Sequence, residues 1–360
     1  MKISILCFSL TGYETSQRLI QALQGRGHEV LLAGKSKYIP DSIEESHTKW
    51  TGKQFRDADA IIFVGACGIA VRSIAPFVKS KKTDPAVLAV DECGNYVISL
   101  LSGHLGGANE LAVLVADMLG ATPVVTTATD LHRRFAVDLF AKKNHCEIKS
   151  LKAAKELTAA LLAGERIGFY SEFGWDGELP AGLLECDREG WQNVIEDSTE
   201  LLQEKKPRIG VAVSIHGDCR PFPVTVQVIP KIVSLGMGCK KGKDAETIER
   251  VARRCLSDNG ILKEALSNLT SIDLKKEEPG LLSLAEKWNL PFETWTEEEL
   301  KQAKGSFTAS DFVKNITGVD NVCERSAVLA SGQGTKITEK YAADGVTVAL
   351  AVRDWRICFE

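Results

Sequence analysis

Several features that would assign a protein class at once are missing from this sequence of 360 residues. It has no apolar run near the ~20 residues that cross a bilayer, which argues against a membrane protein. It has no excess of positive charge, because 44 Lys and Arg stand against 48 Asp and Glu, and the net charge of −4 argues against a general nucleic-acid binder. It has no small-residue cleavage site after its first apolar segment, so we expect a buried strand there and not a signal peptide.

The ten cysteines are scattered along the chain, and none belongs to a C-x-x-C pair. The two that lie closest in sequence are Cys239 and Cys255. This spacing is typical of reduced thiols in a cytoplasm and provides no zinc site. We therefore expect no metal held by the protein itself, and we expect most of these cysteines to be small buried hydrophobic residues.

The length and composition predict an ordinary globular protein with more than one domain. Hydrophobic residues make up 44% and charged residues 26% of a chain that is too long for one core of usual size. Strands alternate with helices in the first and last thirds, which predicts largely parallel sheets between helices. We expect a multi-domain α/β protein with an N-terminal α/β/α layered domain (1–130), a small, variable α/β middle domain (131–230) and a C-terminal α/β domain (231–360).

Several segments carry local signals. The continuous apolar run in 58–66 predicts a strand covered on both faces, and 86–101 predicts two strands around the turn "DECGN". Segment 122–130 predicts a strand followed by a helix start. The three prolines of 216–230 predict that this segment stays at sheet edges and in connections. In 231–256 we expect a strand, a glycine turn and a helix.

The segment 99–121, "SLLSGHLGGANELAVLVADMLGA", places a histidine among glycines immediately before an amphipathic helix. Gly103, Gly106 and Gly107 remove side chains from the turn, so its backbone N–H groups are accessible to a ligand. His104 lies between the first two of these glycines. Free N–H groups and the helix dipole both favour negative charge, and the turn therefore predicts an anion site.

A second candidate anion site lies in the segment 236–244, which is again rich in glycine and precedes a helix. Its candidate groups are Gly236, Gly238, Lys240 and Lys241. Arg72 adds a further cation in the N-terminal third. A ligand with several carboxylates would use these groups despite the acidic overall balance.

Each of these features has a plain structural alternative that the sequence leaves open. A glycine turn before a helix can serve chain geometry alone, and a histidine in a turn can be a surface or capping residue. The lysines suit a solvated loop, and Asp91 before "ECGN" suits a turn former. Composition and motifs alone therefore indicate a cytoplasmic α/β protein that binds an anionic small molecule.

The familiar nucleotide and hydrolase motifs each fail at one or two positions. A P-loop would need glycine at Met237 and Ser or Thr at Asp244, and a dinucleotide fingerprint would need glycine at Lys241. A nucleophile elbow around Ser102 would need glycine at Leu100. Nucleotide binding and serine hydrolysis therefore lose their usual support.

The segments "GIAVRSIAP", "VDECGNYVISLLSGHLGGANELA", "PVVTTATD" and "SLGMGCKKG" follow one another along the chain. In this order they resemble the CbiG family of cobalamin biosynthesis, the cobalt-precorrin-5A hydrolases of the anaerobic pathway. The resemblance covers nearly the whole chain, although the middle section matches only in position and length. It implies a cobalt-bearing tetrapyrrole substrate with acetate and propionate arms, whose δ-lactone is opened and whose two-carbon fragment leaves as acetaldehyde, giving cobalt-precorrin-5B.

The resemblance also implies what the protein binds. It implies no cofactor of the protein's own, since cobalt arrives within the substrate. The expected partners are the cobalt-tetrapyrrole substrate and, transiently, neighbouring enzymes of the pathway, with no nucleic acid and no membrane.

Lactone opening needs a base for the attacking water, and His104 is the best base in the glycine turn, because histidine titrates near neutral pH. Glu110 or Asp91 could orient the imidazole, and the sequence does not decide between them. The same base could also take the proton whose loss releases acetaldehyde.

The developing oxyanion needs hydrogen-bond donors, which we expect from the N–H groups of Gly106 and Gly107 together with Asn109. Arg72, Lys240 and Lys241 would hold the peripheral carboxylates. The candidate substrate-binding set is then Ser102, Gly103, Gly106, Gly107, Asn109, Arg72, Gly236, Gly238, Lys240 and Lys241.

Two other functions remain alternatives. A non-catalytic carrier of tetrapyrrole intermediates would bind several of them and form no product. An unrelated α/β enzyme with a nucleotide cofactor would be stabilised thermally by nucleotides, although the failed glycine fingerprints already count against it.

Overall fold

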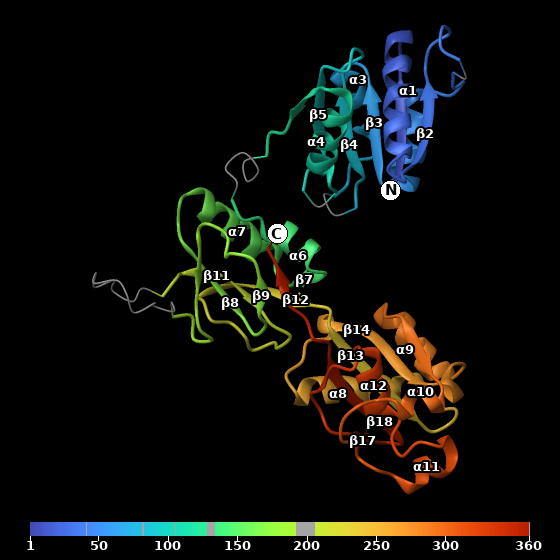
Figure 1. Cartoon of the computed structure of the whole chain (residues 1–360), viewed down its shortest axis with the longest axis vertical. Coiled ribbons are helices and arrows are strands. Elements are labelled where there is room, and N and C mark those ends of the chain that lie inside the picture. The colour runs from blue at the N-terminus through green and yellow to red at the C-terminus, as the bar shows by residue number, and fades with distance from the viewer. Residues whose placement is uncertain (41, 81–82, 105, 128–133, 192–205, 360) are drawn as a thin grey trace. The chain divides into compact units, whose positions relative to one another are not determined.

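The structure, a computed structural model, forms two compact units, Met1–Leu139 and Phe140–Glu360 (Figure 1). The helix start expected before residue 130 lies outside the residues that the structure describes. The described residues are 1–40, 42–80, 83–104, 106–127, 134–191 and 206–359.

The first unit is built on a sheet with the strand order β2-β1-β3-β4-β5-β6. Neighbouring strands are parallel except β4 and β5, which pair antiparallel. All residues of β3 and β4 are buried, which explains why their sequences are apolar without interruption. The strands are β1 (Lys2–Cys7), β2 (Glu29–Gly34), β3 (Ala60–Val64), β4 (Ala86–Val90), β5 (Tyr96–Leu101) and β6 (Thr122–Val124).

Helices cover both faces of this sheet (Figure 1). Helices α1 (Leu10–Gln24) and α4 (Ala108–Leu119) pack into one buried cluster with β1, β3 and β4. Helices α2 (His47–Asp57) and α3 (Cys67–Ile74) contribute to a second cluster on alternate residues of the same strands. The predicted α/β/α layering of the N-terminal domain is therefore confirmed.

Helix α2 was not evident from the sequence, because most of its residues are polar. Its start is fixed by Ser46, whose hydroxyl accepts the N–H of Lys49 at 3.2 Å. Its inner face buries Trp50 together with Thr51 and Gln54. The helix thus depends on one large apolar side chain and a good N-cap, a combination that hydrophobic periodicity detects poorly.

The second unit contains a sheet with the order β10-β8-β11-β12-β7, in which all pairs are parallel except β12–β7. Helix α6 (Val137–Lys143) contains the boundary between the units, and α7 (Leu151–Leu162) follows β7. The strands are β7 (Cys146–Ile148), β8 (Ile167–Ser171), β10 (Leu183–Glu185), β11 (Ile209–Val213) and β12 (Val224–Pro230).

The prediction that prolines keep 216–230 at sheet edges is wrong for β12, which lies between β11 and β7. Pro221 and Pro223 precede this strand, and Pro230 is its last residue. None of the three therefore removes a ladder N–H from the strand's interior, so the usual objection to proline in a central strand does not apply.

The rest of the second unit is a sheet with the order β15-β14-β13-β18-β16, and β17 also pairs with β18. The short strands β9 (Trp175–Asp176) and β19 (Ile357–Cys358) pair with each other. The remaining strands are β13 (Val233–Cys239), β14 (Leu266–Ile272), β15 (Phe292–Trp295), β16 (Thr335–Lys336), β17 (Tyr341–Ala343) and β18 (Val346–Val352). The helices are α8 (Ala245–Asp258), α9 (Pro279–Trp288), α10 (Glu297–Lys301), α11 (Asp311–Thr317) and α12 (Cys323–Ala330), with 3-10 turns η1 (Lys263–Ala265) and η2 (Asp273–Lys275).

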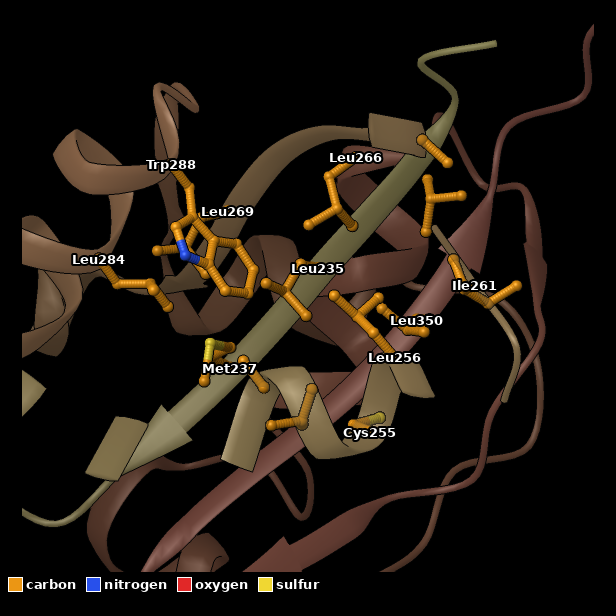
Figure 2. Close-up of a cluster of buried hydrophobic side chains, with 14 of the residues drawn as sticks. Leu235, Met237, Cys255, Leu256, Ile261, Leu266, Leu269, Leu284, Trp288 and Leu350 are labelled. Atoms are coloured by element: carbon orange, nitrogen blue, oxygen red, sulfur yellow. The ribbon is translucent and has the colours of Figure 1, made fainter. Parts of the chain in front are cut away.

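The core of this sheet forms around β13. Leu235 and Met237 are fully buried and point towards side chains of α8, α9, β14 and β18 (Figure 2). Trp288 of α9 and Leu256 of α8 belong to the same cluster. The alternating residues Gly236 and Gly238 lie on the other face of β13. The predicted α/β class is confirmed in both units.

Candidate active site at the start of helix α4

The turn that joins β5 to α4 has an unusual backbone. Ser102 has φ 59°, and Gly107, the N-cap of α4, has φ 80°, a conformation that glycine adopts at little cost. The Ser102 hydroxyl is buried and donates to the carbonyl of Asp84 at 2.9 Å. A Cβ on Gly106 would lie 2.3 Å from Cβ of Ser102, and one on Gly103 would lie 2.7 Å from Oδ1 of Asn109. Two of the glycines therefore allow tight packing within the turn itself.

The turn uses several of its own N–H groups. Gly107 donates to the carbonyl of His104 at 3.0 Å, and Asn109 donates to that of Gly103 at 3.0 Å. The N–H of Ala108 donates to the carbonyl of Ser102 at 3.1 Å. The expectation that the Gly107 N–H is an oxyanion donor is therefore wrong, because that group is already bonded.

The N–H groups of Gly106 and Glu110 make no hydrogen bond in the described part of the chain. Glu110 lies in the first turn of α4, where backbone N–H groups have no intrahelical partner. Gly106 thus remains a candidate donor as predicted. The backbone N–H of Glu110 is a further candidate donor, although the sequence had indicated a role only for the side chain of this residue.

His104 faces a carboxylate that the sequence did not single out. Its Nδ1 lies 3.8 Å from Oδ2 of Asp138, and the two side chains are 16% and 22% exposed. Asp138 lies in the first turn of α6, more than thirty positions after the histidine. No spacing rule relates the two residues, so only the fold could bring them together.

Glu110 and Asp91 do not orient the imidazole. Glu110 is exposed and makes no ion pair or hydrogen bond with His104 among the described residues. Both oxygens of Asp91 are engaged at the turn that follows β4: Oδ1 accepts the N–H of Cys93 at 3.0 Å, and Oδ2 accepts those of Asn95 and Tyr96 at 2.7 and 2.6 Å. Asp91 is thus a turn former, which was the structural alternative for it.

The antiparallel pairing of β4 and β5 separates Asp91 from the glycine turn. Asp91 pairs with Tyr96 at the start of β5, whereas Ser102 follows its end. Six residues of strand correspond to about 20 Å, so the two lie at opposite edges of the sheet. The glycine turn therefore lies at the edge of the sheet where β1, β3 and β4 begin. Strand β6 is parallel to β5, so it ends at this same edge.

Asn109 connects this edge to the segment after β6. Its amide is buried and donates to the hydroxyl of Thr127 at 3.0 Å. The side chain thus supports the arrangement of the turn.

Arg72, on the last turn of α3, is exposed, and its Nη1 lies 3.5 Å from the carbonyl of Gly68.

The second candidate anion site differs from the expected glycine turn. Gly236 and Gly238 lie within β13 and pair with β18, so the expectation of a turn at these residues is wrong. A Cβ on Gly236 would lie 1.9 Å from the carbonyl of Cys323 in α12, and one on Gly238 would lie 2.8 Å from the hydroxyl of Thr347. These glycines allow close packing of the sheet against its neighbours.

The loop between β13 and α8 already contains internal carboxylates. Glu278 accepts the N–H of Gly242 at 2.7 Å, and Asp244 caps α8 by accepting the N–H of Thr247 at 2.7 Å. These acids reduce the attraction of the loop for an anion. Lys240 and Lys241 remain exposed and carry the positive charge of this loop.

Two further observations concern the described residues as a set. They contain no group of three or more His, Cys, Asp or Glu side chains arranged to hold a metal ion. None of their helices combines the length and hydropathy needed to cross a membrane.

Comparisons with known proteins agree on one family. Three family models match successive parts of the chain: Cobalamin synthesis G N-terminal at residues 49–130, Cobalamin biosynthesis central region at 135–230 and Cobalamin synthesis G C-terminus at 233–351. A cobalt-precorrin-5A hydrolase from Salmonella typhimurium is 35% identical over 352 residues, which are 97% of each chain. One from Priestia megaterium is 34% identical over 309 residues, which are 83% of this chain and 79% of that relative. A solved structure of a cobalamin biosynthesis protein G homolog from Sulfolobus solfataricus is 24% identical, with a TM-score of 0.40, and covers 98% of this chain and 97% of its own.

Proposed function

The chain belongs to the CbiG family of cobalamin biosynthesis, and on this premise we propose the reaction that it catalyses. It is a cobalt-precorrin-5A hydrolase, which opens the δ-lactone of its substrate and releases acetaldehyde to give cobalt-precorrin-5B. The observation that supports this most strongly is the 35% identity with the Salmonella typhimurium hydrolase over 97% of both chains.

The first step is attack of water on the lactone carbonyl. His104 takes a proton from this water, and Asp138, 3.8 Å away, orients the imidazole and stabilises its charged form. The tetrahedral intermediate collapses by breaking the acyl–oxygen bond, and the leaving alkoxide takes the proton from His104. The products of this step are a free acetate arm and a macrocycle that carries a hydroxyethyl group.

The N–H groups of Gly106 and Glu110 stabilise the oxyanion of that intermediate. Both have no hydrogen-bond partner in the described residues, and both lie at the amino end of α4, where the helix dipole favours negative charge. A Cβ on Gly107 would meet nothing within 4 Å, so the lactone can approach the backbone of the turn at that residue.

The second step breaks a carbon–carbon bond. A base removes the proton of the new hydroxyl, its oxygen forms the carbonyl of acetaldehyde, and the bond to the macrocycle breaks. The electron pair remains on the macrocycle, which then takes up a proton. The whole reaction consumes one water and releases one acetaldehyde.

The remaining assignments follow from charge and chemistry. Arg72, Lys240 and Lys241 hold peripheral carboxylates of the substrate, since their side chains are exposed cations. The protein uses no cofactor of its own, because cobalt is part of the substrate. Its place is the cytoplasm, where thiols stay reduced, in keeping with the free cysteines. Transient contacts with neighbouring pathway enzymes would transfer the labile intermediates.

An anaerobic assay with cobalt-precorrin-5A tests the proposal. Mass spectrometry would follow loss of the two-carbon fragment, and a coupled assay would detect free acetaldehyde. We expect product from the wild-type protein and, for His104→Ala, retained substrate binding with turnover reduced about 10²- to 10⁴-fold. Binding without product from the wild type would contradict the proposal and favour a carrier.

A further inference from the structure

A second histidine–carboxylate pair lies in the middle sheet, far along the chain from His104. Nδ1 of His216 is 3.1 Å from both carboxylate oxygens of Glu172, a closer contact than that between His104 and Asp138. The Glu172 side chain is 15% exposed and that of His216 is 35% exposed. The carboxylate is thus mostly covered, while a third of the imidazole remains accessible.

The fold places both residues at one edge of parallel strands. Glu172 directly follows β8, and His216 follows the neighbouring strand β11 (Figure 1). Ligand sites in open α/β sheets lie at this carboxyl edge. The Glu172 N–H donates to the carbonyl of Val213 at 3.1 Å, and the His216 N–H donates to the hydroxyl of Ser214 at 2.9 Å. Hydrogen bonds therefore hold the backbone of both residues in place.

The contact with Glu172 favours one tautomer of the neutral imidazole. A carboxylate at Nδ1 accepts the proton of that nitrogen, which leaves a lone pair on Nε2. Nε2 has no hydrogen-bond partner among the described residues. Glu172 thus positions the ring as an acceptor for a proton from outside the protein.

The surroundings indicate proton transfer and not covalent catalysis. Neither Ser171 nor Ser214 contacts a ring nitrogen in the described part of the chain; their hydroxyls accept backbone N–H groups instead. Cys219 is 2% exposed, and burial raises the pKa of its thiol to about 11. In the part of this unit that the structure describes, none of these three residues is therefore an activated nucleophile beside the histidine.

The local charge favours a neutral ligand group. The charged side chains near this edge include the acids Glu172, Glu189 and Asp218 and the base Arg188. Arg188 is also paired with Asp218 at 3.7 Å. A carboxylate arm at Nε2 would be repelled by the Glu172 carboxylate on the same ring, whereas a neutral hydroxyl would donate to Nε2 without that cost.

We propose that His216, positioned by Glu172, is the base of the second step and takes the hydroxyl proton that releases acetaldehyde. This inference rests on the proposed function, because lactone opening creates the hydroxyl that the lactone itself lacks. The oxygen of that hydroxyl becomes the carbonyl of acetaldehyde, the carbon–carbon bond breaks, and the electron pair and a proton remain with the macrocycle. His104 and His216 then serve different steps.

The test separates the two steps by mass. His216→Gln and Glu172→Gln would be assayed anaerobically with cobalt-precorrin-5A beside the wild type, with His145→Asn as the control. His145 is exposed in the same unit at φ 53°, a conformation that asparagine tolerates. We expect both test variants to accumulate a species heavier than the substrate by one water, with acetaldehyde release slowed about 10²-fold or more in His216→Gln.

The outcomes are distinguishable. Acetaldehyde release at the wild-type rate by His216→Gln, or accumulation of unopened lactone, would overturn the inference. If the wild type left the lactone intact, the proposed function would fail, and the inference with it. Circular dichroism checks folding, and ¹⁵N NMR of the imidazole gives an independent readout: we expect the Nδ1–H tautomer in the wild type and its loss in Glu172→Gln. An Nε2–H tautomer in the wild type would also contradict the role assigned to Glu172.

Discussion

The distance between His104 and Asp138 allows the effect of removing the Asp138 charge on kcat to be calculated. At 3.8 Å, opposite unit charges attract by about 1 kcal/mol in water and about 4 kcal/mol at an effective dielectric constant of 20. The side chains are 16% and 22% exposed, which places the interaction between these limits, at about 2 kcal/mol. In the proposed mechanism Asp138 stabilises the imidazolium that forms as water attacks, so Asp138→Asn should lower kcat for lactone opening about 30-fold.

The assay is a single-turnover measurement of lactone loss by mass spectrometry, with substrate affinity measured separately. We expect the affinity to stay within about threefold of the wild type, because Asp138 acts on the transition state and not on substrate binding. Asp117→Asn is the matched control, since Asp117 is exposed on α4 and should leave kcat unchanged. A wild-type rate in Asp138→Asn, or an equal loss in the control, would refute the assignment of Asp138.

Three further predictions concern the turns and helices around the sites. Gly106→Ala should lower the free energy of unfolding by about 1–3 kcal/mol in a denaturant titration, because its Cβ would lie 2.3 Å from that of Ser102. Asp91→Ala should lower the free energy of unfolding by a similar amount, because three backbone N–H groups lose their acceptor. It should leave kcat unchanged. A large drop in kcat in a variant of unchanged stability would instead indicate that Asp91 acts in the active site. The ammonium of Lys287, hydrogen-bonded to Glu249, lowers the pKa of that carboxyl to about 2, so its stabilising contribution is present above the ordinary value of 4.5 and is lost as pH falls from there towards 2. Unfolding titrations between pH 6 and pH 2 should therefore show a smaller acid-induced loss in Glu249→Gln than in the wild type, and parallel curves would contradict this.

The sequence predicted those parts of the fold that depend on local pattern. The unbroken apolar runs of β3 and β4 indicated strands covered on both faces, and "DECGN" indicated the turn between two strands. It failed where a residue's role depends on distant packing. Gly236 looked like part of a ligand-binding turn, yet its lack of a side chain is explained by the carbonyl of Cys323 in α12.

The candidate site shows the same division. The glycine turn and His104 were evident from sequence because their residue types are unusual at a helix start. Asp138 was not, because α6 reaches the histidine only in three dimensions. The Gly107 N–H was assigned wrongly for a local reason: a turn of this shape bonds it to the carbonyl of His104 at 3.0 Å, and no residue pattern reveals that bond.

The reversal of β5 places the starts of α1 and α4 at opposite edges of the sheet. Dinucleotide-binding sheets place phosphate at the amino end of the helix after the first strand. Here that position, before α1, already holds a carboxylate, because the N-cap hydroxyl of Ser9 donates to Oε2 of Glu92 at 2.6 Å. Thr15 of α1 donates to the carbonyl of the same glutamate at 2.8 Å and helps to hold it there. A phosphate before α1 would face this charge. At the start of α4, the N–H groups of Gly106 and Glu110 make no hydrogen bond among the described residues, and the carboxylate of Asp138 is paired with His104 at 3.8 Å. In the proposed mechanism the oxyanion therefore lies at the edge of the sheet opposite to the usual phosphate position.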